Sequence, residues 1–317
     1  MPRQKTNILA DMCLRPRHAP VDQQHAARRA AAGAAVRGEK LHDEIMHNQR
    51  IKEYPQGFVE VLTASKPIFR EPGYELAGKW ASEPRQRPET PPADKPEGRK
   101  AANVERAVRR AKQNLRDLAL CNGMRYFVTL TLDQAVIDRH DMAAITRKLN
   151  AWCSNMVQRN GLAYILVPER HKDGAVHFHG FVNDAVEVAD SGTISLPGGG
   201  KPRKPRSKAQ RSEWLADGGH IVYNLPDWPM GFTTAIELYG DPVAAVGYCC
   251  KYIGKQMSAD GSPEKIGGRW FYHGGCHMKP EVRYDDVDFD SMALLDNAYA
   301  WEVPAAGAIF VKERINL

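Results

Sequence analysis

The segment "LAYILVPERHKDGAVHFHGFV", residues 162–182, constrains the fold of this chain more than any other. Two short apolar runs, rich in β-branched and aromatic residues as strands are, flank the polar sequence HKDG. If Lys172, Asp173 and Gly174 form a three-residue loop, with Gly174 in the left-handed conformation, the two runs pair as an antiparallel hairpin. The register of that hairpin then decides which side chains share a face of the sheet.

In this register His171 pairs with Ala175, and Glu169 lies directly opposite His177. Side chains alternate across a strand, so His177 and His179 lie on one face. Cross-strand neighbours approach within roughly 4.5–5.5 Å at Cβ, and Glu169 therefore joins the two histidines. Two imidazoles and a carboxylate suit a divalent metal and leave coordination positions open. The alternative is a strand with two half-buried histidines held by hydrogen bonds, and a His-x-His motif alone favours that alternative.

The sequence around the hairpin predicts further strands and helices. Apolar periodicity and capping residues predict helices over residues 103–123, 141–161 and 241–257. Strands are predicted over residues 124–133, 231–240 and 268–275. Because hairpins rather than crossovers stand at the centre of this order, we expect an α+β fold with a central antiparallel sheet and helices packed on it.

Alternation in "YFVTLTL", residues 126–132, predicts the orientation of the first strand of this region. One set of side chains is expected to pack on helices, and the other to line the face that carries the histidines. The first set is Val128, Leu130 and Leu132, and the second is Phe127, Thr129 and Thr131. Alternatively, the threonines are present because they favour strand structure.

Composition divides the chain into three parts. Residues 81–100 contain five prolines and few apolar side chains, which is typical of a linker and puts a boundary near residue 98. Residues 1–98 are then a poorly structured N-terminal extension of unassigned role, in which residues 22–53 favour helix through their alanines but lack an apolar stripe. Residues 99–285 form the domain, with a basic insertion at 197–213. Residues 286–317 are an acidic and apolar tail.

Basic residues are clustered on both sides of the histidine strand. One cluster lies in "ERAVRRAKQNLR" and the other in "KPRKPRSKAQR", which contains no acidic residue. Charge runs are usually solvated surface, but two clusters around one strand favour a polyanionic partner such as DNA. The candidate DNA-binding residues are Arg106, Arg109, Arg110, Lys201, Arg203, Lys204 and Arg206.

The cysteines and the apolar segments indicate the compartment. None of the six cysteines has the spacing of a metal knuckle, and Cys249 and Cys250 are adjacent. The N-terminus has no apolar core of a signal peptide, and no window is long and apolar enough for a membrane span. We therefore expect a reduced cytoplasmic protein without a membrane partner.

The segment "YCCKYIGK" places tyrosines and lysines on one helical stripe. Tyr248, Lys251, Tyr252 and Lys255 stand at i, i+3, i+4 and i+7. The opposite side is expected to pack, through Val243, Val246, Cys250, Ile253 and Met257. A phenol is a possible nucleophile at phosphorus, and an adjacent ammonium favours the phenolate and the charge of the transition state. Alternatively, this is a surface helix whose tyrosines lie against lysine stems.

Three segments together resemble a known family. "YFVTLTLD", "VHFHG" and "YCCKYIGK", in this order and spacing, resemble the motifs of HUH (His-hydrophobic-His) rolling-circle replication initiators. The doubled Y-x-x-K-Y-x-x-K resembles the gene A protein type of isometric single-stranded-DNA phages. The resemblance covers roughly residues 100–280 and implies the RRM-like HUH palm. It implies that His177 and His179 are metal ligands, with Glu169 the third, and that Tyr248 and Tyr252 attach to a 5′ phosphate.

The activity implied by the resemblance is nicking and rejoining of single-stranded or locally melted DNA at a replication origin. A divalent metal, Mg²⁺ or Mn²⁺, would polarise the scissile phosphate while a tyrosine attacks, and Lys251 and Lys255 would position that phosphate. The free 3′ hydroxyl would prime a host polymerase. Since the chain has no Walker motif, a host helicase is an expected partner in the cytoplasm of a bacterial cell. The alternatives are a relaxase or transposase of the same chemistry, and a non-catalytic nucleic-acid-binding module.

Overall fold

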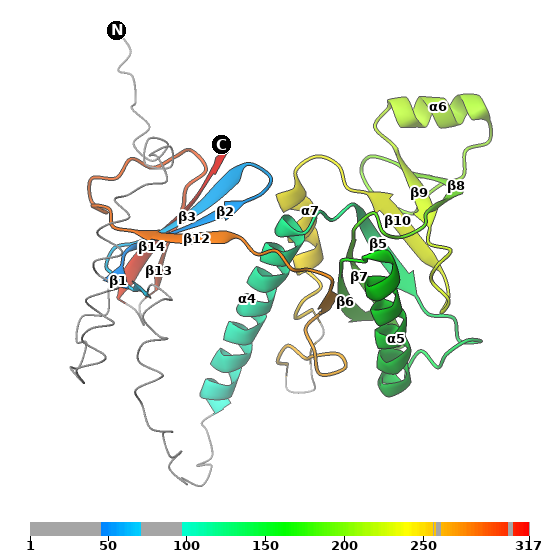
Figure 1. Ribbon diagram of the computed structural model, residues 1–317, viewed down its shortest axis with the longest axis horizontal. Helices are drawn as coiled ribbons and strands as arrows, with labels where there is room; N and C mark the ends of the chain where they lie inside the picture. Colours follow the sequence, from blue (N-terminus) through cyan, green and yellow to red (C-terminus); the bar gives the residue numbers. More distant parts are fainter. Residues whose placement is uncertain (1–45, 71–96, 256, 258–260, 304–306, 317) are drawn as a thin grey trace. The chain divides into compact units, whose positions relative to one another are not determined.

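The computed structural model describes residues 46–70, 97–255, 257, 261–303 and 307–316, and it divides the chain into two compact units (Figure 1). One unit spans Pro92–Lys279. The other combines Met1–Pro91 with Pro280–Leu317. The segments 1–45 and 71–96, which include most of the predicted linker and of the alanine-rich stretch, lie outside the described residues.

A seven-stranded antiparallel sheet forms the centre of the unit Pro92–Lys279. Its strand order is β11-β6-β7-β5-β10-β9-β8. In chain order the strands are β5 (Tyr126–Thr131), β6 (Tyr164–Arg170), β7 (Val176–Val182), β8 (Ala189–Ser195), β9 (His220–Asn224), β10 (Thr233–Glu237) and β11 (Tyr272–Gly274). The predicted antiparallel sheet is therefore confirmed, and the β6–β7 hairpin lies within it.

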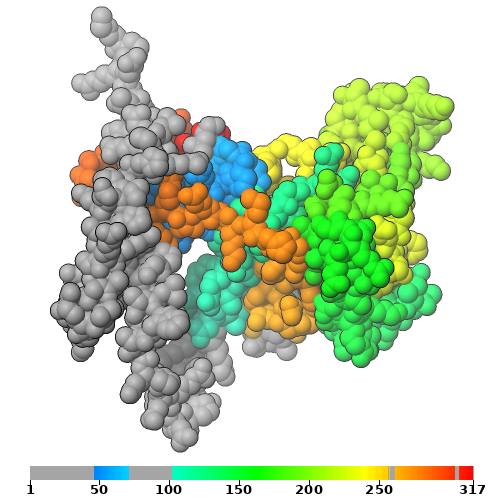
Figure 2. All heavy atoms as spheres, viewed as in Figure 1, coloured from blue at the N-terminus to red at the C-terminus, as the bar shows by residue number. Residues whose placement is uncertain are grey.

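One face of this sheet is covered by α5 (Met142–Asn160), as Figures 1 and 2 show. The helix begins after Asp141, whose side chain accepts from two backbone amides, and ends at Gly161 in the left-handed conformation. Its buried residues are Ile145, Leu149, Trp152, Cys153 and Met156. They pack against Val128, Leu130 and Leu132 of the first predicted strand, as the alternation in the sequence predicted.

The opposite face carries the site residues, and we call it the site face. Two helices, α4 (Glu97–Cys121) and α7 (Pro242–Cys250), contact each other beside it, and α4 also contacts β6. The remaining helix of the described ranges, α6 (Lys208–Ala216), lies with β8 and β9 at one edge of the sheet (Figures 1 and 2). In this region the sequence predicted a polar insertion. The strands β8 and β9 and the helix α6 were not predicted.

The second unit is a β-structure that joins the two ends of the chain. Its five-stranded antiparallel sheet has the order β12-β2-β3-β14-β13, and β1 pairs with β4 beside it. The strands are β1 (Met46–His47), β2 (Gln49–Tyr54), β3 (Phe58–Ala64), β4 (Phe69–Arg70), β12 (Glu281–Asp285), β13 (Tyr299–Val303) and β14 (Ala308–Asn316). Ile51, Val59, Val61 and Ile315 form its core.

This unit corrects the division made from the sequence. Residues 46–70 are strands, not part of a poorly structured extension or an alanine-rich helix, and residues 286–317 are not a separate tail. β14 pairs with β3 over seven residue pairs, from Phe310–Ala64 to Asn316–Phe58. Pairing between segments about 250 positions apart leaves no local signal in the sequence. No helix in the described part of the chain is long and apolar enough to cross a membrane.

Candidate active site

The hairpin between β6 and β7 has the register predicted from its loop. His171 N donates to Ala175 O at 2.9 Å, and Gly174 adopts a φ of +85°. Glu169 lies directly opposite His177. The single-residue slip that would have turned Glu169 to the other face is therefore absent from this hairpin.

The three candidate ligands converge on the site face. Glu169 Oε2 lies 3.1 Å from His177 Nε2 and 2.9 Å from His179 Nε2, and the two Nε2 atoms are 2.8 Å apart. The side chains of Glu169 and His179 are each 13% exposed, and that of His177 is 5% exposed. These groups could hold a metal ion, because one ligand atom from each lies within 4.8 Å of the others.

The charges of the cluster suit a cation. Burial lowers the pKa of His177 to about 4, with further lowering by His179 and His171, and it also lowers the pKa of His179. Burial opposes ionisation of Glu169, but Lys255 and the two histidines outweigh it, so that the pKa of this carboxyl lies below its ordinary value. At neutral pH the cluster is one carboxylate and two neutral imidazoles, which is the protonation state that binds metal.

Neighbouring side chains orient the two imidazoles. Thr129 Oγ1 lies 3.1 Å from His179 Nδ1, which leaves Nε2 of His179 directed toward Glu169. The ring of His171 stacks on that of His177, with centroids 3.9 Å apart. His177 Nδ1 is buried and has no hydrogen-bond partner within the described ranges. Both imidazoles therefore present Nε2 to the carboxylate, and the donor set fits a divalent cation.

Thr129 confirms one sequence prediction, whereas His171 was missed as a site neighbour. Thr129 pairs with His179, and Thr131 pairs with His177, so both threonines lie on the site face. The role of Thr129 in orienting His179 follows from this pairing and could have been inferred once β5 was placed beside β7. The stacking of His171 on His177 has no signal in the residue pattern, because the two residues are not cross-strand partners.

The helix predicted to carry both tyrosines is shorter than expected, so that Tyr248 lies in it and Tyr252 lies beyond its end. It ends at Cys250, and i→i+3 bonds continue the chain, including Tyr252 N to Cys249 O at 3.1 Å and Lys255 N to Tyr252 O at 3.2 Å. The buried side of this segment also differs from the prediction. Cys249 is buried in place of the predicted Cys250, and Met257 is 52% exposed. Val246 and Ile253 are buried as expected.

The two phenols nevertheless meet beside the ligand cluster. Tyr252 donates from its hydroxyl to that of Tyr248 at 2.9 Å. The Tyr252 ring stacks on His179 with centroids 4.1 Å apart, and the Tyr248 ring meets Phe127 edge-on at 5.8 Å. Burial, followed by the hydrogen bond to Tyr248, raises the pKa of Tyr252. Tyr248 is 50% exposed, so its hydroxyl is open to a ligand from solvent.

The two lysines have different contacts. Lys255 forms an ion pair with Glu169 Oε1, the carboxylate oxygen not shared with the histidines. Its ammonium also lies over the Tyr252 ring, 5.5 Å from the centroid. Lys251 lies over the Tyr248 ring at 5.4 Å. Each tyrosine thus has one cation beside its ring, and Lys255 links the tyrosine segment to the ligand cluster.

The candidate DNA-binding residues are surface groups on two elements of this unit. Those on α4 and those in the insertion between β8 and α6 all have exposed side chains, namely Arg106, Arg109, Arg110, Lys201, Arg203, Lys204 and Arg206. Arg203 is also fixed by its backbone, which exchanges two hydrogen bonds with Ile194 of β8. The structure does not bring these residues into the ligand cluster, and a role for them would be in holding DNA outside it.

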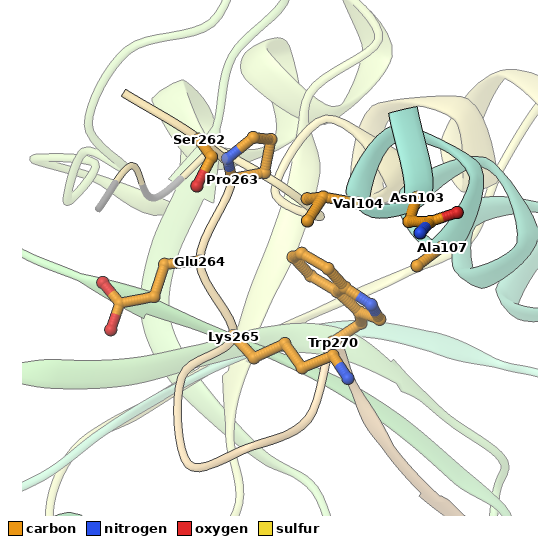
Figure 3. Close-up of a pocket in the computed structure, with 8 residues that line it drawn as sticks. All are labelled: Asn103, Val104, Ala107, Ser262, Pro263, Glu264, Lys265 and Trp270. Carbon is orange, nitrogen blue, oxygen red and sulfur yellow. The ribbon is translucent and has the colours of Figure 1, made fainter. Parts of the chain in front are cut away.

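A separate cavity of about 490 Å³ lies between α4 and the loop before β11 (Figure 3). Val104 and Ala107 of α4 face the ring of Trp270, and the rest of the lining is formed by Asn103, Ser262, Pro263, Glu264 and Lys265. None of the predicted catalytic, metal-binding or DNA-binding residues lines this cavity. It is therefore distinct from the candidate active site.

Comparison with known proteins agrees with the motifs. No curated protein and no solved structure matches the chain. Residues 125–257, from the start of β5 to the segment after α7, match the family model "Replication-associated protein ORF2/G2P". All three ligands and both tyrosines lie within this range. This segment, less than half of the chain, is therefore similar to replication-associated proteins.

Proposed function

We propose that this protein is a rolling-circle replication initiator that nicks and rejoins single-stranded DNA with a tyrosine nucleophile. The observation that carries the proposal is that two phenols lie directly beside the ligand cluster. The hydroxyls of Tyr248 and Tyr252 are 2.9 Å apart, and the Tyr252 ring lies on His179. The match to replication-associated proteins supports the biological setting.

The chemistry follows from the groups present. A phenol oxygen of Tyr248 or Tyr252 attacks phosphorus in line, the bond to the 3′ oxygen breaks, and the protein keeps the 5′ phosphate as a phosphotyrosine. The phenol loses its proton, and the departing 3′ oxygen becomes a hydroxyl that can prime synthesis. A divalent cation held by Glu169, His177 and His179, Mg²⁺ or Mn²⁺, would supply positive charge to the phosphate. The ester bond conserves the energy needed for rejoining, so that no nucleotide cofactor is required.

Charged side chains assist at two places. Lys251, beside Tyr248, favours the phenolate and the negative charge that develops on the phosphate. Lys255 holds Glu169 ionised and directed toward the histidines. The exposed arginines of α4 and the basic insertion would hold the DNA backbone, and binding through them would weaken as salt is raised.

The same geometry would serve a relaxase or transposase, which differ in their DNA rather than in their chemistry. The tandem tyrosines favour replication, because a cycle of nicking and rejoining uses two nucleophiles in turn. A non-catalytic binding module is the alternative of another class. It is disfavoured by the carboxylate, since Glu169 opposite two imidazoles contributes nothing to binding a polyanion.

The test is a covalent adduct. The protein is incubated with single-stranded DNA of mixed sequence and Mn²⁺, and the products are separated on a denaturing gel. We expect a protein band shifted by attached DNA, and we expect excess EDTA or His177→Ala to remove it. DNA binding should remain nearly unchanged in His177→Ala, because the basic segments supply the backbone affinity. A full adduct in excess EDTA would remove the metal from the mechanism, and the absence of any adduct with Mn²⁺ would refute the nuclease.

A further inference from the structure

Phe232, the residue directly before β10, is the most exposed of the large hydrophobic side chains in the described ranges. It is 71% exposed. The adjacent Thr233 is buried, and its Oγ1 accepts from Leu225 N at 2.7 Å. Thr131 N donates to Phe232 O, so the pairing with β5 continues one residue beyond β10, and alternation then places Phe232 on the side opposite Thr233, which is the site face. An aromatic ring there adds little to the core and is available to a ligand.

Phe232 continues a row of residues that crosses the site face. Its carbonyl accepts from Thr131 N at 2.8 Å, and Thr131 lies directly opposite His177. His177 lies opposite Glu169 in turn. Neighbouring strands are about 4.7–4.9 Å apart, so the backbone of Phe232 stands roughly 10 Å from that of His177. This separation fits a ligand that spans adjacent nucleotides.

The backbone that carries Phe232 is held by two hydrogen bonds from β5 and the residues directly after it. Besides the bond from Thr131, Met230 O accepts from Asp133 N at 2.8 Å. Trp228, which is buried, donates its Nε1–H to Thr131 O at 3.2 Å. The main chain is therefore fixed while the phenyl ring is exposed. A ring presented on a fixed backbone loses little conformational entropy when a flat ligand stacks on it.

The surroundings of Phe232 match a nucleic acid strand. Thr131 and Thr234 offer small polar side chains beside it on the same face. Beyond β10, the sheet continues through β9 to β8 and the exposed Lys201, Arg203 and Lys204 of the insertion. An aromatic ring between a phosphate site and a basic segment is the arrangement by which proteins bind single strands without reading their sequence.

We propose that Phe232 stacks on a nucleobase of the single-stranded DNA, next to the phosphate that lies at Glu169, His177 and His179. The proposal rests on the proposed function, because it takes the DNA to lie across the site face. It assigns Phe232 to positioning the strand, not to the chemistry. By this placement, stacking fixes which phosphate reaches the tyrosines.

The experiment compares two oligonucleotides with one backbone. Full-length protein is titrated, with EDTA present, into fluorescent oligo(dT) of about 20 nucleotides and into an abasic oligomer of the same length, and anisotropy is recorded. Phe232→Ala should weaken binding of oligo(dT) by roughly 5- to 150-fold, the range of one stacked base. It should leave binding of the abasic oligomer unchanged. Equal affinities of Phe232→Ala and the unchanged protein for oligo(dT) would overturn the proposal.

Two further variants separate stacking from apolar contact. Phe232→Trp should keep the affinity for oligo(dT), whereas Phe232→Leu, which has no ring, should behave as Phe232→Ala. Since the side chain is exposed, all three should melt within a few degrees of the unchanged protein. If Phe232→Leu binds oligo(dT) as tightly as the unchanged protein, the contact is not stacking and the proposal is wrong.

Adduct formation with Mn²⁺ is measured on the same preparations, so that failure of the proposal and failure of the proposed function are distinguishable. A ring-dependent affinity without any adduct supports the stacking role and refutes the nuclease. An adduct together with unchanged affinity in Phe232→Ala supports the nuclease and refutes the stacking role.

Discussion

Tyr248 and Tyr252 are neighbours in space but differ in their surroundings. Tyr252 stacks on His179, and its pKa is raised, whereas Tyr248 is half exposed and accepts the hydrogen bond that Tyr252 donates. Under the proposed function, the half-exposed Tyr248 would be the phenol for a first attack, and Tyr252, stacked on His179, would serve in a second.

If the two phenols act in turn, each single variant should keep part of the activity. Tyr248→Phe and Tyr252→Phe should each form some covalent adduct with single-stranded DNA, because the two hydroxyls are 2.9 Å apart and the remaining one can reach the same phosphate. The double variant should form none. Adduct yield and strand transfer on a denaturing gel measure both outcomes. Alternation is wrong if one single variant is inactive while the other matches the unchanged protein in cleavage and transfer.

Metal affinity should depend on pH in a way that the buried histidines determine. Burial lowers the pKa of His177 to about 4, and the pKa of Glu169 also lies below its ordinary value. Lowered values mean that protons compete with the metal only in acid, so Mn²⁺ affinity should stay nearly constant from pH 8 to about pH 6 and fall as the pH approaches about 4. Titration calorimetry at several pH values measures this. A loss of affinity centred near pH 6.5, the ordinary value for histidine, would contradict it.

Gly180, directly after the second histidine, sets the spacing between β6 and β7. A Cβ added there would lie 1.9 Å from the carbonyl oxygen of Ile165, which is backbone and cannot turn away. Gly180→Ala should therefore separate the two strands that carry Glu169, His177 and His179. We expect a loss of unfolding free energy of about 1–3 kcal/mol or more, together with weaker Mn²⁺ binding. Thermal unfolding and metal titration measure the two effects.

A matched control lies on α7. A Cβ added at Gly247 meets no atom within 4 Å, and the position is exposed and helical. Gly247→Ala should leave stability unchanged or raise it by up to about 1 kcal/mol. A Gly180→Ala variant as stable as Gly247→Ala would show that the close approach of the two strands carries no cost.

The predictable part of the molecule is local in sequence. The HKDG loop determined which residues face each other across β6 and β7, so Glu169 and His177 could be paired from turn geometry alone. The site face of β5 followed from alternation of Thr129 and Leu130. The predictions that were wrong concern the winding at a helix end and the pairing of segments far apart in the sequence. The end of α7 at Cys250 reflects a change to tighter turns, and the pairing of β3 with β14 joins remote segments.

At the scale of the whole molecule, one unit is continuous in sequence, and the other is formed by the segments before and after it. All three ligands, both tyrosines and the basic segments belong to the unit Pro92–Lys279, whereas the five-stranded sheet takes strands from both sides of it in sequence. Each unit has its own buried core. We therefore expect the two units to unfold as separate cooperative transitions, and the candidate active site to depend on the unit Pro92–Lys279.

Removal of β14 should show whether the two units fold independently of each other. This strand pairs with both β3 and β13, and its buried Glu313 accepts from Leu295 N at 2.7 Å. A chain that ends at residue 307 should therefore lose the five-stranded sheet, because β3 becomes an edge and β13 has no neighbour. Calorimetry should then show one unfolding transition in place of two, while Mn²⁺ affinity and adduct formation stay within about twofold of the full chain. A parallel loss of metal binding would show that the site needs the terminal sheet, and the strands from both ends of the chain would then have to be counted among the elements that build the active site.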